Sequence, residues 1–215
     1  MFDDFEVEVL YNPRLKHSYI RVDIHNNISV KTPHRSKSFV LSLLNEKKLW
    51  IFKQINKNNQ RDIVHINLED EVLLFGKIYS IDSDEATLLR NKLYRLQSKD
   101  KIKIQKAYDD FYKERAKNYL SQELKKHALR MNLHFTELKF RKMRRRWGSC
   151  SSTGVITLNT QLMKLKKEYI EYVLIHELAH LVHMNHSKKF HALVTSYLPD
   201  AKEIRKQLKT SRVLS

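Results

Sequence analysis

Apolar and polar residues alternate along three short stretches near the N-terminus, which is the pattern of half-buried β-strands. The stretches are residues 5–10, 19–24 and 28–31. Asn26 and Asn27 form a candidate hairpin turn between the last two. Beyond Ser36, a candidate N-cap, apolar residues recur at helical spacing as far as residue 59. These residues are Phe39, Leu43, Leu44, Ile51 and Ile55. We therefore expect a small sheet covered by one helix.

The strand pattern returns in the middle of the chain. Strands are expected at residues 63–68, 71–75 and 77–81, and the last two meet in a tight turn at Gly76. Residues 83–104 show no clear pattern.

A long helical pattern follows, because apolar side chains keep helical spacing from residue 107 to residue 131. We expect a second part of the chain to begin here, which divides the chain into residues 1–105 and 106–215. Its further elements are an extended segment at 134–147, a hairpin at 152–154, a strand at 155–159, and helices at 167–183 and 187–208 with a break at 198–200. This order of strands and helices predicts an α+β fold.

The composition is that of a globular protein. The chain has 215 residues, of which 41% are hydrophobic, and this is enough for a sizeable core. No stretch of about 18 apolar residues occurs. The first residues, MFDDFEVEVL, are acidic where a signal peptide would be basic, so we expect a cytoplasmic protein with no membrane partner. Cys150 is the single cysteine, so any bound metal would need histidine and carboxylate ligands.

The net charge of +17 is concentrated in the C-terminal half. Residues 1–100 contain 16 Lys and Arg against 14 Asp and Glu, whereas residues 101–215 contain 25 against 10. Such a surplus attracts polyanions, of which nucleic acid and nucleotide phosphate are the obvious ones. The alternative is a lysine-rich surface that only favours solubility.

Residues 173–190, VLIHELAHLVHMNHSKKF, contain the most specific chemical pattern. In HELAH, His176 and His180 are four residues apart, so they lie on one face of a helix and can share one metal ion. Glu177 lies on the adjoining flank, from which its carboxylate can reach a water molecule on the ion without being a ligand. The alternative is a set of core histidines that are satisfied by other hydrogen bonds.

A catalytic zinc site usually has three protein ligands, so a third donor is expected downstream. His183 lies two turns along the same helix and is too distant if that helix continues. His186 follows a candidate turn and precedes Ser187, a candidate cap of the next helix, so it can fold back over the ion. We favour His186 as the third ligand. His191, which lies deeper in that helix, is a candidate substrate-facing group.

The stretches RRRWGSCSSTGVITLN and YVLIHELAHLVHMNHSKKF resemble the YgjP-like metallopeptidase domain, a bacterial group related to SprT-like proteases and other zincins. The resemblance covers nearly the whole chain. It implies a zincin-like domain, with the HExxH helix packed on other helices and a β-hairpin, after a small N-terminal β-rich region. It also implies that His176, His180 and His186 are the metal ligands and that Glu177 is the general base. The residue after N-H-S-x-x-F is often tryptophan in such sequences and is His191 here, so His191 stays open as an alternative ligand.

The WGSCS segment and the strand after it are a candidate substrate edge. An edge strand above the metal helix can pair with an extended peptide, and residues 154–159 are expected to supply it. Trp147 and Gly148 are expected to build the turn and pack the hairpin on the helix. Cys150 is expected to be a small buried side chain. Asn159 either holds substrate or caps the strand end.

The basic run RKMRRR, residues 141–146, precedes this hairpin. If the run is a strand, Lys142, Arg144 and Arg146 face the same way. Arg144 and Arg146 are therefore candidate substrate-binding residues for phosphate or carboxylate groups. The alternative is a solvated charged strand at the edge of the sheet.

The sequence thus predicts a metal-dependent hydrolase with one Zn²⁺ ion, although imidazole ligands also accept Ni²⁺ or Co²⁺. A metallopeptidase that acts on a peptide or protein, with Glu177 as general base, is favoured. One alternative is a nucleoside triphosphate phosphohydrolase, for which no Gly-rich phosphate loop is present. The other is a DNA-associated protease or nucleic-acid-binding module of the SprT-like type.

Overall fold

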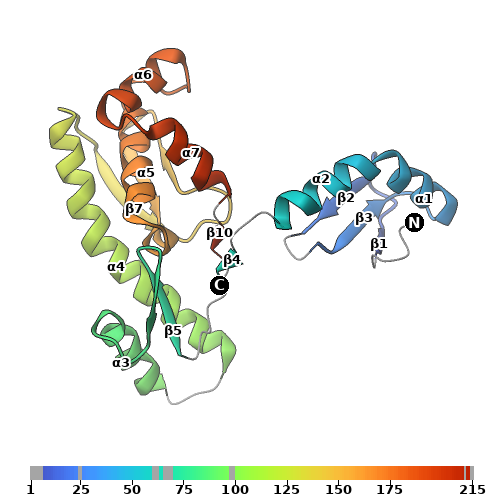
Figure 1. Ribbon diagram of the computed structural model, residues 1–215, viewed down its shortest axis with the longest axis horizontal. Coiled ribbons are helices and arrows are strands. Elements are labelled where there is room, and N and C mark those ends of the chain that lie inside the picture. The colour runs from blue at the N-terminus through green and yellow to red at the C-terminus, as the bar shows by residue number, and fades with distance from the viewer. Residues whose placement is uncertain are drawn as a thin grey trace. The chain divides into compact units, whose positions relative to one another are not determined.

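Figure 1 shows the computed structural model, which describes residues 7–23, 26–59, 63–64, 70–96, 100–210 and 212–213. The chain divides into two compact units, Met1–Asp62 and Ile63–Ser215. The boundary between the units therefore differs from the predicted division at residues 105 and 106.

The first unit contains a three-stranded sheet. Its strands β1 (Val7–Tyr11), β2 (Tyr19–Val22) and β3 (Ile28–Thr32) lie in the order β1-β3-β2, with β1 parallel and β2 antiparallel to β3. The carboxylate of Asp23 accepts hydrogen bonds from the backbone and side-chain N–H groups of Asn27 at 2.9 and 3.0 Å, which fixes the connection between β2 and β3. Residues 5, 6 and 24 of the predicted strands lie outside the described residues.

Two helices pack on this sheet, where the sequence predicted one. They are α1 (Lys37–Glu46) and α2 (Lys48–Asn59), and Ser36 caps α1 by accepting a hydrogen bond from Phe39 N at 3.3 Å. The chain leaves helical geometry at Lys47, and the core of the unit receives apolar side chains from both helices. That core consists of Ile28, Val30, Val40, Leu44, Ile51 and Ile55.

The second unit begins with short strands. The hairpin of β5 (Glu71–Leu74) and β6 (Lys77–Ser80) turns at Phe75 and Gly76, whose φ angles of 51° and 76° are both left-handed. A two-residue turn of this kind matches the twist of the strands and favours glycine. β4 (Ile63–Val64) pairs in parallel with β10 (Arg212–Val213), and the rest of the strand predicted at 63–68 lies outside the described residues.

Helices occupy much of the stretch that showed no clear pattern. It contains η1 (Asp84–Ala86), α3 (Thr87–Leu96) and the first turn of α4 (Lys101–Arg130). The hydroxyls of Tyr108 and Tyr112 on α4 donate to the carbonyl oxygens of Glu71 and Leu73 on β5 at 2.7 and 2.9 Å. These bonds join the hairpin to α4, and α3 packs on the same helix.

A second three-stranded sheet follows α4. It contains β7 (Glu137–Arg141), β8 (Gly148–Cys150) and β9 (Val155–Asn159) in the order β7-β9-β8, and leads into η2 (Thr160–Lys164). Two predictions are therefore wrong. Residues 142–147 form a loop, so strand alternation does not orient Arg144 and Arg146. Residues 154–159 offer no free edge, because β9 is paired on both sides, and the edge strands are β7 and β8.

Three helices complete the second unit: α5 (Lys167–Ala179), α6 (Lys188–Tyr197) and α7 (Ala201–Thr210). α5 ends four residues before the predicted end, because the N–H groups of Leu181 and Val182 bond carbonyls only three residues back. The predicted helix at 187–208 is interrupted at 198–200, as expected.

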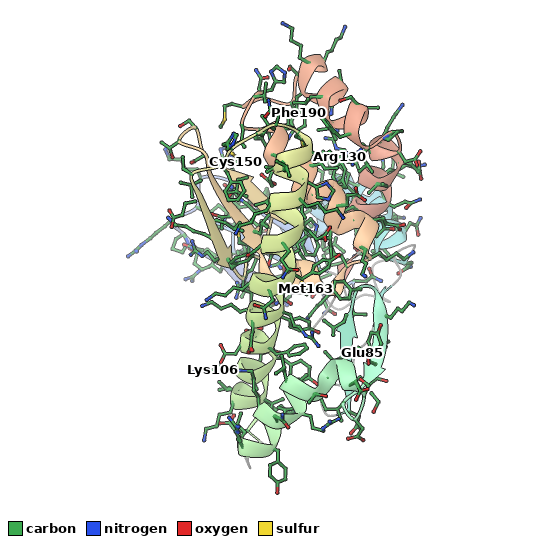
Figure 2. All side chains as sticks on the ribbon, turned by 90° about the vertical axis from the view of Figure 1, so that its left-hand side faces the viewer. Glu85, Lys106, Arg130, Cys150, Met163 and Phe190 are labelled. Atoms are coloured by element: carbon green, nitrogen blue, oxygen red, sulfur yellow. The ribbon has the colours of Figure 1, made fainter. Side chains whose placement is uncertain are left out.

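The core of the second unit lies where α4, β9 and α5 meet. It includes Phe111, Leu120 and Leu124 from α4, Ile156 and Leu158 from β9, and Leu174, Ile175 and Leu178 from α5. Figure 2 shows Cys150 and Phe190 toward the Arg130 end of α4, and Glu85 and Lys106 toward its other end. The α+β class is confirmed. No helix among the described residues combines the length and the apolar character needed to cross a membrane.

Candidate metal centre

Three histidines converge at the end of α5. His176 and His180 come from the last turn and the C-cap of that helix, and His186 comes from the loop before α6. Their ring centroids are 4.8 to 5.0 Å apart, and Nε2 of His176 lies 3.1 Å from Nε2 of His186. One ligand atom from each residue lies within 4.8 Å of the other two, so the group could hold a metal ion. Ser187 caps α6 by accepting a hydrogen bond from Phe190 N at 3.3 Å, which fixes the chain directly after His186.

Two of the rings are oriented through their other nitrogen atom. Nδ1 of His180 faces the carbonyl oxygen of His183 at 3.0 Å, so it must be the protonated nitrogen, and Nε2 has a free lone pair. Nδ1 of His176 lies 3.4 Å from the hydroxyl of Tyr172, one turn earlier on α5. Such partners hold ligand rings in place and set their tautomer. Tyr172 was not predicted, although its spacing of four residues from His176 is the helical signal that could have indicated it.

Phe190 forms an apolar wall beside the three imidazoles. Its fully buried ring lies 4.9, 4.6 and 4.8 Å from the rings of His176, His180 and His186. His191 stacks on His186 at 6.2 Å and is not in the group that could share an ion. The signal for Phe190 was its place four residues after His186, on the first turn of α6.

Glu177 is buried beside β8. Glu177 is 5% exposed, and its Oε2 atom has no hydrogen-bond partner among the described residues. A Cβ atom at Gly148 would lie 2.6 Å from both Cγ and Oε1 of Glu177. Gly148 is therefore required by the space that Glu177 occupies rather than by a turn, and the hairpin turn lies at Gly154 instead, with φ 80°.

Burial changes the acid–base properties of these groups. It raises the pKa of Glu177 to about 7, an effect that the charge of Arg146 partly opposes. It lowers the pKa of His176 to about 3, and the neighbouring imidazoles add to this. The pKa of His186 is also lowered, first by burial and then by His180. The imidazoles of His176 and His186 are thus favoured in the neutral form, which is the form that binds metal.

The remaining candidate residues divide into two groups. Arg146 lies close enough to Glu177 for its charge to lower the pKa of that carboxyl. Arg205 on α7 likewise lies close enough to His176 and His186 for its charge to lower their pKa values. Arg205 gave no sequence signal, because only the packing of α7 on α5 brings it to the site. Arg144 is exposed. Asn159 caps η2 through Gln161 N at 3.1 Å, which is the strand-end role.

The predicted packing of the WGSCS segment is confirmed only in part, because the turn lies at Gly154 and Cys150 is partly rather than fully buried. Trp147 and Cys150 are partly buried against the main core of the second unit. Burial raises the pKa of the Cys150 thiol, and the charge of Glu177 adds to this, so a reactive thiolate is disfavoured.

The residues present fit a divalent metal ion. Three imidazoles converge on one point, and two of their rings are oriented through Nδ1. The buried Oε2 atom of Glu177, the residue directly after His176, has no hydrogen-bond partner among the described residues. This donor set suits zinc and its neighbours in the first transition row.

Comparison with known proteins agrees with this chemistry. The family model "YgjP-like, metallopeptidase domain" matches residues 16–211. Among solved structures, the metallopeptidase zymogen abylysin of Pyrococcus abyssi is 29% identical, with a TM-score of 0.39, over 42% of this chain and 91% of that one. The metallopeptidase zymogen jannalysin of Methanocaldococcus jannaschii is 21% identical, with a TM-score of 0.37, over 41% of this chain and 91% of that one. No curated protein matches the chain.

Since the family model spans residues 16–211 of a 215-residue chain, this protein belongs to the YgjP-like metallopeptidase family.

Proposed function

We propose that the protein is a zinc-dependent peptidase in which His176, His180 and His186 hold the ion and Glu177 is the general base. The observation that carries the proposal is the convergence of the three imidazoles within 4.8 Å, together with the buried carboxylate of Glu177, whose Oε2 atom has no hydrogen-bond partner among the described residues. A bound zinc ion supplies Lewis acidity, which polarises a substrate carbonyl and lowers the pKa of water.

Glu177 performs the proton transfers. Its pKa of about 7 lets the carboxylate accept a proton near neutral pH and release it again in the same cycle. In peptide hydrolysis Oε2 takes the proton of the attacking water and delivers it to the leaving amine nitrogen. Gly148 leaves room for the carboxylate, because a Cβ atom at that position would lie 2.6 Å from Cγ and Oε1 of Glu177.

Two positive charges lie close to this centre. Arg146 is near Glu177 and Arg205 is near His176, so either guanidinium is a candidate for stabilising negative charge on the substrate oxygen. His191 is a third candidate, since it stacks on His186 at 6.2 Å.

Metal content tests the ligand set. Elemental mass spectrometry on untagged protein should find one equivalent of zinc in the wild type and in His191→Ala, and none in His176→Ala or His186→Ala. Zinc that is retained in His186→Ala and lost in His191→Ala would move the third ligand. A wild type without metal would return the histidines to a packing role.

Turnover tests the general base. Glu177→Gln should keep its zinc and lose hydrolysis of quenched fluorescent casein by at least about a hundredfold. Full activity of this variant would refute the assignment. Phosphate release from nucleoside triphosphates, measured with and without chelator, would reveal the alternative phosphohydrolase.

A further inference from the structure

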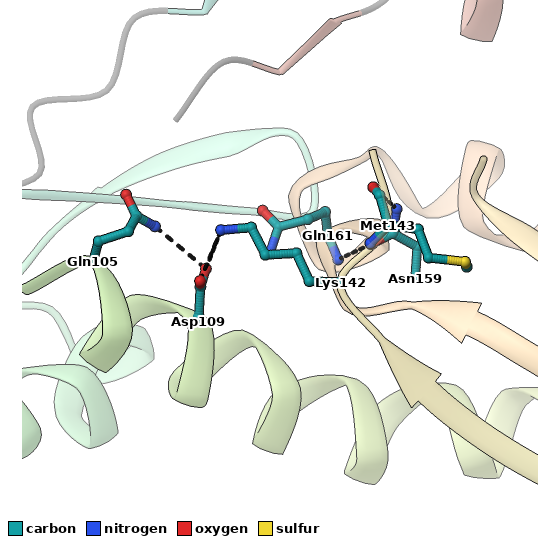
Figure 3. Close-up of polar contacts among 6 residues, drawn as sticks. All are labelled: Gln105, Asp109, Lys142, Met143, Asn159 and Gln161. Atoms are coloured by element: carbon teal, nitrogen blue, oxygen red, sulfur yellow. Dashed lines mark hydrogen bonds and ion pairs between the residues drawn. The ribbon is translucent and has the colours of Figure 1, made fainter. Parts of the chain in front are cut away.

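The loop of residues 142–147 is fastened to α4 at its beginning. Nζ of Lys142 lies 2.7 Å from both carboxylate oxygens of Asp109, which also accepts a hydrogen bond from Gln105 Nε2 at 3.3 Å. Figure 3 shows this chain of contacts running from the helix to the loop. The first residue of the basic loop therefore has its charge matched within the protein.

Asn159, at the end of β9, fastens the rest of the loop. Its Nδ2 donates to the carbonyl oxygens of Met143 and Arg146 at 2.8 and 2.9 Å, and its Oδ1 accepts from Met143 N at 3.3 Å. The backbone N–H of Asn159 also donates to Trp147 O at 2.9 Å. Asn159 is only 2% exposed, so the loop has a built and buried anchor (Figure 3). A loop fixed in this way loses little conformational entropy when it binds a ligand.

Three arginines stand on the anchored loop with their charges unmatched. Arg144, Arg145 and Arg146 are all exposed, and none forms an ion pair within the described part of the chain. Lys142, in contrast, is used inside the protein. A guanidinium presents a planar fork of donors that matches a carboxylate or a phosphate with two parallel hydrogen bonds. The loop thus has unused capacity for anionic groups.

The loop also leads directly into the candidate centre. Arg146 is two residues before Gly148. A Cβ atom at Gly148 would lie 2.6 Å from Cγ and Oε1 of Glu177, so the glycine leaves room for that carboxylate. Gly148 begins β8, an edge strand of the sheet. An anion bound at the arginines would therefore lie near the group that is to act on the substrate.

We propose that the loop of residues 142–147 recognises acidic side chains of a peptide substrate and gives the enzyme a preference for Asp or Glu near the scissile bond. This inference rests on the proposed peptidase function. A peptide fits better than a polynucleotide, because the three arginines occupy one short loop beside the centre. A protein that binds a nucleic acid strand instead has basic groups along the whole length of the bound strand.

Direct binding tests the preference without turnover. Full-length Glu177→Gln protein, loaded with zinc, is titrated into two short fluorescein-labelled peptides that differ only in Glu against Gln at the positions around an apolar central pair. We expect the acidic peptide to bind about tenfold more tightly at low salt, and this ratio to fall to about one when Arg144→Gln and Arg145→Gln are added. Arg144→Glu with Arg145→Glu should reverse the preference.

A matched control carries the same change of charge elsewhere. Lys117→Gln with Lys125→Gln removes the charges of two exposed lysines of α4, and should keep the tenfold ratio. Equal affinity for both peptides in the unaltered loop would overturn the proposal, and so would an equal loss of preference in the control. Displacement of the acidic peptide by a single-stranded oligonucleotide at lower concentration would also overturn it, in favour of nucleic acid. Loss of zinc or of casein hydrolysis in the wild type would instead refute the proposed function, and peptide binding would still decide the role of the loop.

Discussion

Gly148 offers the sharpest test of how Glu177 is positioned. In Gly148→Ala the new Cβ would lie 2.6 Å from Cγ and Oε1 of Glu177 and 2.7 Å from Cδ. Carbon atoms in contact prefer about 3.5 Å or more, so the carboxylate must move by roughly 1 Å. A displacement of about 1 Å in a catalytic group can lower the rate about a hundredfold, or about 2.7 kcal/mol in the barrier.

The assay compares kcat/KM for quenched casein with zinc content and melting temperature. Gly148→Ala should lose activity about a hundredfold, keep its zinc, and lose about 1–3 kcal/mol of stability through overpacking. Gly154→Ala is the matched control, since its φ of 80° strains any side chain while its new Cβ would meet Thr136 at 3.3 Å and not Glu177. Wild-type kcat/KM in Gly148→Ala would refute the reasoning. An equal loss of kcat/KM in Gly154→Ala would show that the loss of activity in Gly148→Ala comes from reduced stability alone.

Three further predictions concern other groups of the second unit. Tyr172→Phe should weaken zinc binding about 10- to 100-fold in competition with a chromogenic chelator, because Nδ1 of His176 loses its partner at 3.4 Å, whereas Tyr169→Phe on the same helix should bind zinc as the wild type does. Burial lowers the pKa of Lys164 from 10.5 to about 8, so between these pH values the unfolded chain binds more protons than the folded chain. The free energy of unfolding should therefore rise by up to about 3 kcal/mol from pH 8 to pH 10.5. Urea titrations of Lys164→Met should show no such rise. Asn159→Ala removes four side-chain hydrogen bonds and should make residues 142–147 a preferred site of trypsin cleavage; unchanged resistance would contradict its role as the anchor.

Local geometry explains which parts of the site could be predicted. His176 and His180 follow from the four-residue period of a helix, and the prediction needed nothing beyond that helix. His186 was favoured because a capped helix start follows it, and the cap at Ser187 is present. The ligand and base roles of these residues stay predictions until metal content and turnover are measured.

Long-range pairing explains what the sequence could not show. β9 looked like an edge strand because its neighbours in sequence form a hairpin, but β7 pairs with its other side from about twenty residues away. The arginine run looked like a strand because charged residues carry no apolar period that would contradict it, and only the bonds from Asn159 and Asp109 reveal a loop. Arg205 reaches the site because α7 packs on α5, and no local pattern records that contact.

The early end of α5 has an electrostatic consequence. Since the helix ends at Ala179 with His180 as its C-cap, the C-terminal end of the helix dipole lies at His176 and His180. The aligned peptide dipoles give this end of a helix a partial negative charge of about half an electron, which favours a cation by about 0.3–1 kcal/mol and disfavours an anion. The backbone itself would thus help to retain the metal ion between turnovers and to release a carboxylate product from the site.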